Sequence, residues 1–156
     1  MTALWRPDWE WSLPLIAVTV TLHVAGIIGI GVLVAHVRVL AEERHVGRTA
    51  SALLAIAMIG TVGWILAILF GVEAALWAGV YMLLGAIEVP ANAMLYSVDC
   101  MTTLGSTDAL QLPRQWKLMG ALEAANGVLL FGISTAFLAT VLSEFRSWLP
   151  GRADLK

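Results

Sequence analysis

A short segment, TTLGSTD at residues 102–108, holds the residue types best suited to chemistry in this chain. Threonine offers a hydroxyl oxygen beside its backbone carbonyl, and glycine lets the backbone turn so that a carbonyl points inward. Oxygens arranged in this way can replace the hydration shell of a cation. One short loop cannot surround an ion, so several chains would each contribute a copy. The segment predicts a cation-coordinating loop, although an ordinary external loop is the alternative interpretation.

The elements that must position this segment are apolar helices. Residues 11–37, 49–72 and 124–143 contain no Asp, Glu, Lys or Arg. Each stretch is long enough to cross the hydrocarbon core as a helix, and lipid forces backbone polar groups to pair within the segment. Pro90 suits the first turn of a further helix at 90–102, which at 1.5 Å per residue is too short to cross. We expect that helix to be re-entrant.

The overall composition points to lipid as the solvent of this protein. Hydrophobic residues make up 60% of the chain and charged residues 13%, and the mean hydropathy is +0.85. Soluble chains are about half apolar and a quarter charged. The net charge of -2 argues against nucleic acid as a partner, and the single Cys100 excludes an intrachain disulfide. The expected fold class is an all-α integral membrane protein.

Two stretches resemble a known family. Residues 96–108, YSVDCMTTLGSTD, resemble the pore helix and filter of potassium channels, whose usual filter reads TVGYGD or TLGYGD. Residues 123–139, EAANGVLLFGISTAFLA, resemble the inner helix of small bacterial ion channels. The resemblance covers about 73–144 and implies a homotetrameric pore. It places Thr103, Leu104, Gly105, Ser106 and Thr107 at the five filter positions, with monovalent cations at Thr103, Leu104 and Gly105. K⁺ is the first expected permeant ion and Na⁺ the second candidate.

Two acidic residues flank this predicted filter. By the resemblance, Asp108 takes the acidic position just outside the filter, and Asp99 stands where some potassium channels keep a carboxylic acid behind it. The resemblance implies that the pair shares a proton and braces the filter. The alternative is that Asp99 caps or hydrogen-bonds locally.

The sequence departs from the family pattern at two filter positions. Ser106 replaces the usual aromatic residue, and Thr107 replaces the second glycine. A left-handed backbone costs a residue with a side chain about 1–2 kcal/mol, and β-branched residues tolerate it worst. We therefore expect weakened potassium selectivity.

The last helix supplies the predicted cavity and hinge. The resemblance to potassium channels implies that the cavity is lined by Val128, Phe131, Thr135 and Ala139. This mostly apolar stripe suits a gate that closes by dewetting. Gly127 and Gly132 are the hinge candidates. Gly127 serves equally well as a small residue for close helix packing.

Several other residues carry separate expectations. His23 lies near the middle of the first span, and we expect a neutral imidazole bonded to a neighbouring helix. Glu73 and Glu88 are predicted to be outer-surface carboxylates. Glu123, near the start of the last helix, is within reach of the pore-helix region, but the sequence does not decide its role. Cys100 is predicted to be a small buried residue of the pore helix.

The distribution of basic residues gives the expected orientation. Arginine and lysine are more frequent in the loop at 38–48 and in the C-terminal tail than on the other side. The positive-inside rule then puts the C-terminus in the cytoplasm and the N-terminus outside a plasma membrane. Asp8 and Glu10 occupy the place of a positive n-region, so the first helix is expected to be retained rather than cleaved.

These expectations divide the chain into three parts. Residues 1–48 hold the N-terminal segment, the first membrane helix and a cytoplasmic loop, and residues 147–156 form a short cytoplasmic tail. The pore domain, 49–146, contains an outer helix 49–72, an extended helix 73–87, the pore helix 90–102, the filter 103–108 and an inner helix 117–145.

The expected function is a tetrameric channel for monovalent cations, with no cofactor and no enzyme activity. A non-conducting structural or regulatory tetramer with a degenerate filter is the alternative. A membrane enzyme or redox carrier is disfavoured, since three histidines cannot supply two paired sets of haem ligands and no HExxH motif is present.

Overall fold

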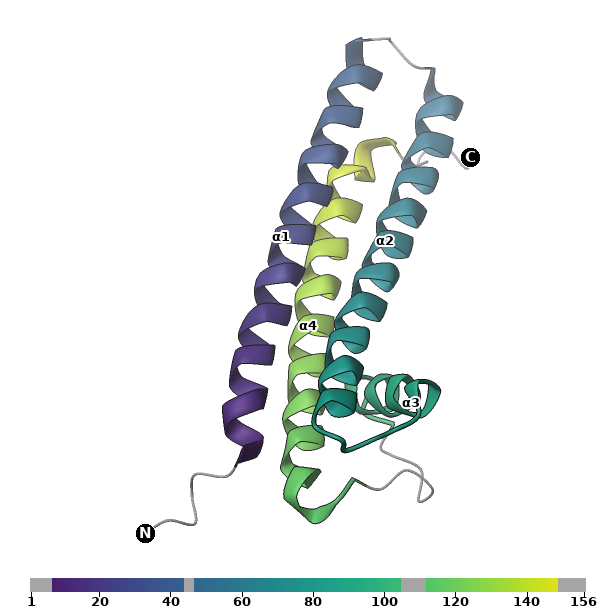
Figure 1. The fold of residues 1–156 in the computed structure, drawn as a ribbon. Helices are drawn as coiled ribbons and strands as arrows, with labels where there is room; N and C mark the ends of the chain where they lie inside the picture. Colours follow the sequence, from purple (N-terminus) through teal and green to yellow (C-terminus); the bar gives the residue numbers. More distant parts are fainter. Residues whose placement is uncertain (1–6, 44–46, 105–111, 149–156) are drawn as a thin grey trace. The chain divides into compact units, whose positions relative to one another are not determined.

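The computed structural model describes residues 7–43, 47–104 and 112–148 (Figure 1). Its elements are α1 (Pro7–Glu43), α2 (Arg48–Leu83), α3 (Pro90–Met101), the 3-10 turn η1 (Arg114–Trp116), α4 (Lys117–Glu144) and the 3-10 turn η2 (Arg146–Trp148). No strand occurs in these described ranges. The all-α prediction is confirmed.

Three of these helices are long and apolar enough to cross a membrane. The candidate spans are Asp8–Glu43, Thr49–Leu83 and Arg114–Glu144. The prediction of three helices that are long and apolar enough to span a membrane is confirmed. The helices run beyond the uncharged stretches because their flanking residues include good helix formers such as Ala, Leu and Glu.

The predicted outer helix and its predicted extension form one element. α2 runs without a break from Arg48 to Leu83, so residues 73–83 continue the second helix. The turn after Leu83 contains Gly85, which has a φ of +64°. The Ala86 N–H donates to the Tyr81 carbonyl at 2.9 Å and the Gly85 N–H donates to the Met82 carbonyl at 3.0 Å. This pair of bonds is a Schellman motif, in which glycine takes the left-handed position without strain.

α3 begins where the sequence predicts. Val89 is extended, with φ -92° and ψ 120°, because the following proline disfavours a helical conformation there. Pro90 then occupies the first turn, where a missing N–H costs no helical bond.

The chain divides into two units. Unit 1 is made from Met1–His23 and Leu69–Gly132, and unit 2 from Val24–Ile68 and Ile133–Lys156. Each of the three long helices therefore contributes one part to each unit.

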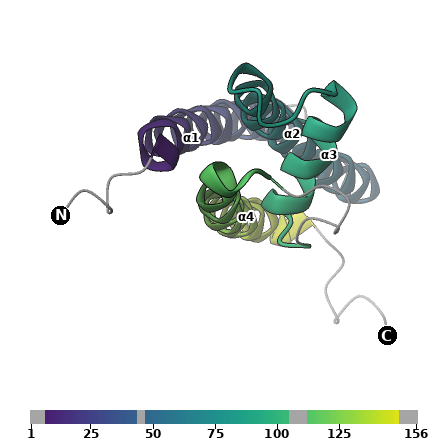
Figure 2. The same cartoon turned by 60° about the horizontal axis from the view of Figure 1, so that its bottom comes forward.

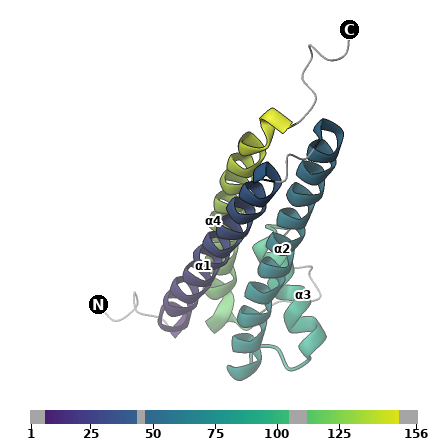
Figure 3. The ribbon, with the colours of Figure 1, turned by 90° about the horizontal axis from the view of Figure 1, so that it is seen from above.

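Unit 2 has its own apolar core. Figure 3 gives a view of the parts of α1, α2 and α4 that form it. The buried side chains are Ile30, Val34, Ala55, Met58, Val62, Leu66, Val141 and Phe145. At the edge of this unit, Arg38 contacts Glu42 at 3.3 Å and Glu144 at 3.7 Å. These pairs are partly exposed, so each contributes little to stability.

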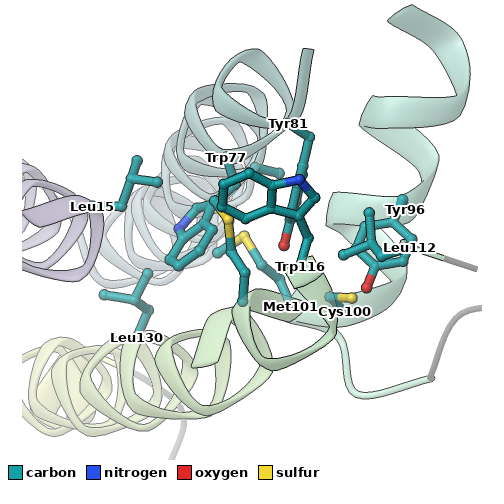
Figure 4. Close-up of a cluster of buried hydrophobic side chains, with 11 residues drawn as sticks. Leu15, Trp77, Tyr81, Tyr96, Cys100, Met101, Leu112, Trp116 and Leu130 are labelled. Atoms are coloured by element: carbon teal, nitrogen blue, oxygen red, sulfur yellow. The ribbon is translucent and has the colours of Figure 1, made fainter. Parts of the chain in front are cut away.

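Unit 1 holds α3, which packs against α2 and the first part of α4 (Figure 2). Its buried core is rich in aromatic and sulfur-containing side chains (Figure 4). The core consists of Leu15, Ala74, Trp77, Tyr81, Tyr96, Cys100, Met101, Leu112, Trp116, Met119 and Leu130. The Tyr81 and Tyr96 rings meet edge to face with centroids 5.2 Å apart. The candidate site lies in this unit.

Candidate functional site

The C-terminal end of α3 leads directly into the predicted filter. The Thr103 N–H donates to the Cys100 carbonyl at 3.0 Å, and the Leu104 N–H donates to the Asp99 carbonyl at 3.1 Å. These two bonds repeat the Schellman motif that ends α2. Thr103 stands in the left-handed position, with a φ of +59°.

Thr103 is thus strained where α2 has an unstrained glycine. Among the residues that the structure describes, it alone has a positive φ without being glycine. The conformation costs a β-branched residue about 1–2 kcal/mol. Strain of this kind persists where the surroundings impose it, and it is enriched at functional sites.

The rest of the predicted filter is outside the described residues. This applies to Gly105, Ser106, Thr107 and Asp108. The strain predicted at Thr107 and the proton shared between Asp99 and Asp108 therefore stay predictions. Asp99 itself is half-buried on α3, and its carbonyl accepts the Leu104 bond.

A hollow of about 550 Å³ lies beside Thr103. It is lined by Met101, Thr102, Thr103, Val128, Phe131 and Gly132. The side chains of Val128 and Phe131 are 58% and 63% exposed in the single chain. The structure therefore brings the first predicted filter residue together with two predicted cavity residues and one predicted hinge glycine. Thr135 and Ala139, which belong to unit 2, are also exposed.

Two glycines of α4 allow α3 to approach closely. A Cβ added to Gly127 would overlap the backbone of Met101, with the Met101 Cα at 2.6 Å. A Cβ added to Gly120 would overlap the Tyr96 hydroxyl and lie 3.3 Å from its Cζ. By contrast, nothing lies within 4 Å of the corresponding position at Gly132. These contacts favour the packing interpretation of Gly127 over the hinge, whereas Gly132 keeps the hinge prediction open.

A buried polar cluster ties α3 to α2 and α4. The Tyr81 hydroxyl donates to Glu123 Oε2 at 2.7 Å. Ser97 Oγ contacts both Glu123 Oε1 and the Ala74 carbonyl, the latter at 2.8 Å. The side chains of Ser97 and Glu123 have no exposed surface. The open question about Glu123 is thus answered, because it bonds to the middle of α3.

A second buried polar pair joins α1 to α2. His23 Nδ1 and Glu73 Oε1 are hydrogen-bonded at 2.9 Å, and both side chains are fully buried. The prediction that His23 bonds to a neighbouring helix is confirmed. The prediction that Glu73 is a surface carboxylate is wrong, because Glu73 turns inward to meet this histidine. Glu88 is exposed, as predicted.

Another buried contact lies one helical turn from this pair on α1. Asn126 Nδ2 donates to Thr19 Oγ1 at 2.9 Å, and the Thr19 hydroxyl in turn donates to the Leu15 carbonyl at 2.9 Å. The contact links α4 to α1.

Cys100 is buried, as predicted, with 6% of its surface exposed. Figure 4 shows the Tyr96 hydroxyl directed at its sulfur. Burial raises the pKa of the Cys100 thiol to about 11. The thiolate form is the nucleophile, so this cysteine is inert as long as α3 stays packed.

The contacts of Tyr81, Ser97 and Gly120 were not predicted from the sequence. One signal for Tyr81 was available, because Glu73, Trp77 and Tyr81 recur every four residues and so share a face of α2. Within the described residues, no group of three or more His, Cys, Asp or Glu side chains is placed to hold a metal ion. No protein-family model, curated protein or solved structure matches this chain.

Proposed function

We propose that this chain is one subunit of a homotetrameric membrane pore for monovalent cations, in the manner of potassium channels. The observation that carries the proposal is the hollow beside Thr103. It joins the end of a short helix, the start of a threonine- and glycine-containing segment and an exposed apolar face of a membrane-spanning helix.

The exposed face of α4 that lines the hollow is apolar, which supports its being covered by something other than water. Val128 and Phe131 are large apolar residues, more than half exposed, that line the same hollow as Thr102 and Thr103. In a tetramer, four such faces around one axis would line a cavity, and the segment after α3 would stand at its end. The last carbonyls of α3 carry partial negative charge, which favours a cation near this point.

The short α3 supports a re-entrant rather than a spanning role. It has 12 residues, against 37, 36 and 28 for the three long helices. At 1.5 Å per residue it measures about 18 Å, well short of a hydrocarbon core of about 30 Å. Ser97 of α3 is buried and paired with Glu123 of α4, as a polar side chain within lipid requires.

Cysteine accessibility tests whether the face of α4 lines a conduction path. In a Cys100→Ser background, Phe131→Cys is reconstituted in vesicles and treated with a water-soluble, charged thiol reagent. Current should fall on treatment, because the attached charge would obstruct the cavity. Trp64→Cys is the matched control, since Trp64 is an apolar residue of α2 that is 70% exposed. Its modification should leave the current unchanged.

Two outcomes count against the proposal. Equal sensitivity of the two variants would mean that the face of α4 is no more a conduction path than the outside of α2. An intact tetramer that carries no current before modification would favour the non-conducting alternative.

A further inference from the structure

Three contacts between oxygen atoms connect Tyr81, Glu123, Ser97 and the Ala74 carbonyl in one chain. They join Tyr81 Oη to Glu123 Oε2, Glu123 Oε1 to Ser97 Oγ, and Ser97 Oγ to the Ala74 carbonyl oxygen. The chain of contacts therefore runs from α2 through α4 and α3 and back to α2. Each contact is an oxygen facing an oxygen, so each needs one hydrogen between its two atoms.

Counting hydrogens along this chain fixes their positions. The Ala74 carbonyl can only accept, so the Ser97 hydroxyl hydrogen must point at it. Ser97 Oγ then has only an acceptor lone pair left for Glu123. The hydrogen of the contact between Ser97 and Glu123 must therefore be bonded to Glu123 Oε1. The Tyr81 hydroxyl supplies the hydrogen of its own contact with Glu123 Oε2. An ionised Glu123 has no hydrogen to give, and one contact would become two acceptor oxygens face to face.

The surroundings of Glu123 agree with this count. Among the described residues, the titratable groups that interact with it are Tyr81 on α2 and Tyr96 and Cys100 on α3, and none of these is a basic side chain. The Glu123 side chain has no exposed surface. Within the described residues, no ion pair joins Glu123 to a basic side chain. A carboxylate in such a place would be a buried charge without compensation from these residues, which is strongly unfavourable.

We propose that Glu123 is held as a neutral carboxylic acid and acts as the positioning residue that fixes α3 between α2 and α4. As an acid it donates to Ser97 and accepts from Tyr81 at the same time, and Ser97 passes the chain on to Ala74. Since α3 ends at Met101, with Thr102 as its C-cap residue, this acid sets the position of the segment that begins at Thr103. The inference goes beyond the proposed pore, because it concerns a protonation state that exists whether or not the protein conducts.

Infrared spectroscopy of the purified full-length protein tests the protonation state directly. A protonated carboxylic acid has a carbonyl stretch well separated from carboxylate bands and shifted by D₂O. The difference between wild type and Glu123→Gln at neutral pH should show the loss of that band. Glu88→Gln, which removes an exposed carboxylate, should not affect it. Glu73→Gln identifies any band from the other buried glutamate. A difference spectrum containing only carboxylate bands for Glu123 overturns the proposal.

The reactivity of Cys100 tests the positioning role. Glutamine reproduces the neutral acid, because its amide N–H₂ can donate to Ser97 and its carbonyl can accept from Tyr81. Glu123→Gln should therefore label with a thiol reagent at the wild-type rate. Glu123→Ala should label roughly tenfold faster, since losing a buried hydrogen bond shifts local opening by about that factor. If the Ala variant does not fold, Ser97→Ala takes its place. Labelling of Glu123→Gln as fast as that of either Ala variant contradicts the proposal.

Discussion

Thr103 adopts a backbone conformation that glycine adopts at the equivalent point of α2. The φ values are +59° and +64°, and the two pairs of hydrogen bonds are of the same kind. The chain could end α3 with glycine at no conformational cost, as it does at Gly85. A threonine in this place makes sense if its hydroxyl is needed beside the hollow, as the proposed cation site requires.

Exchanging the two residue types measures this strain. Thr103→Gly should raise the free energy of unfolding by about 1 kcal/mol, because it relieves a left-handed β-branched residue. Gly85→Thr should lower it by a similar amount, for the same reason in reverse. Thermal or chemical unfolding of the two variants in detergent gives both values. Destabilisation by Thr103→Gly would mean that the threonine side chain makes contacts worth more than the strain.

The inward carboxylate of Glu73 sets a second expectation for single residues. Removing one partner of a buried, paired ionisable couple costs about 3–5 kcal/mol, because the other is left without a partner. We expect His23→Leu and Glu73→Leu each to be strongly destabilising. The double variant should be less destabilised than the sum of the two, and a double-mutant cycle measures the difference. Simple additivity would show that the pair contributes no coupling.

At the scale of elements, the glycines of α4 decide how α3 docks. Gly127→Ala should destabilise the protein by about 1–3 kcal/mol, since the new methyl group would meet the Met101 backbone, which cannot move aside as a side chain can. Gly132→Ala is the matched control on the same helix. It meets nothing within 4 Å and should be neutral or stabilising by up to about 1 kcal/mol. The two midpoints of thermal unfolding check this, and equal effects would contradict the close packing at Gly127.

The sequence predicted α3 and the three long helices better than it predicted the contacts between them. Proline at position 90 predicted the start of α3 because its effect on the backbone is local. The three long stretches without charged residues predicted the long helices, because this signal is also contained within one continuous segment of the chain. The partners of Glu73 and Glu123 depend on which faces of separate helices meet, and a single sequence does not encode that in a local pattern. Glu73 directly follows an apolar run, which is a typical position for a surface group, and no local pattern indicates that its side chain bonds to His23.

At the scale of the whole molecule, we predict that the three long helices each cross the membrane, which would place the two termini on opposite sides. Single cysteines at Thr2 and at Leu155, each in a Cys100→Ser background, should react with an impermeant reagent from opposite faces of sealed vesicles. The positive-inside rule predicts that position 2 is outside. Reaction of both positions from one side would mean an even number of crossings, in conflict with the three long helices.

The central claim is that four copies of this chain form a cation pore. The most direct measurement is the reversal potential of the purified protein in bilayers with unequal potassium and sodium salts of one anion on the two sides. We expect a cation-selective current, with a reversal potential between that of a strictly potassium-selective pore and that of a pore that does not distinguish the two ions. An anion-selective current, or no current from a protein shown to be tetrameric, would contradict it.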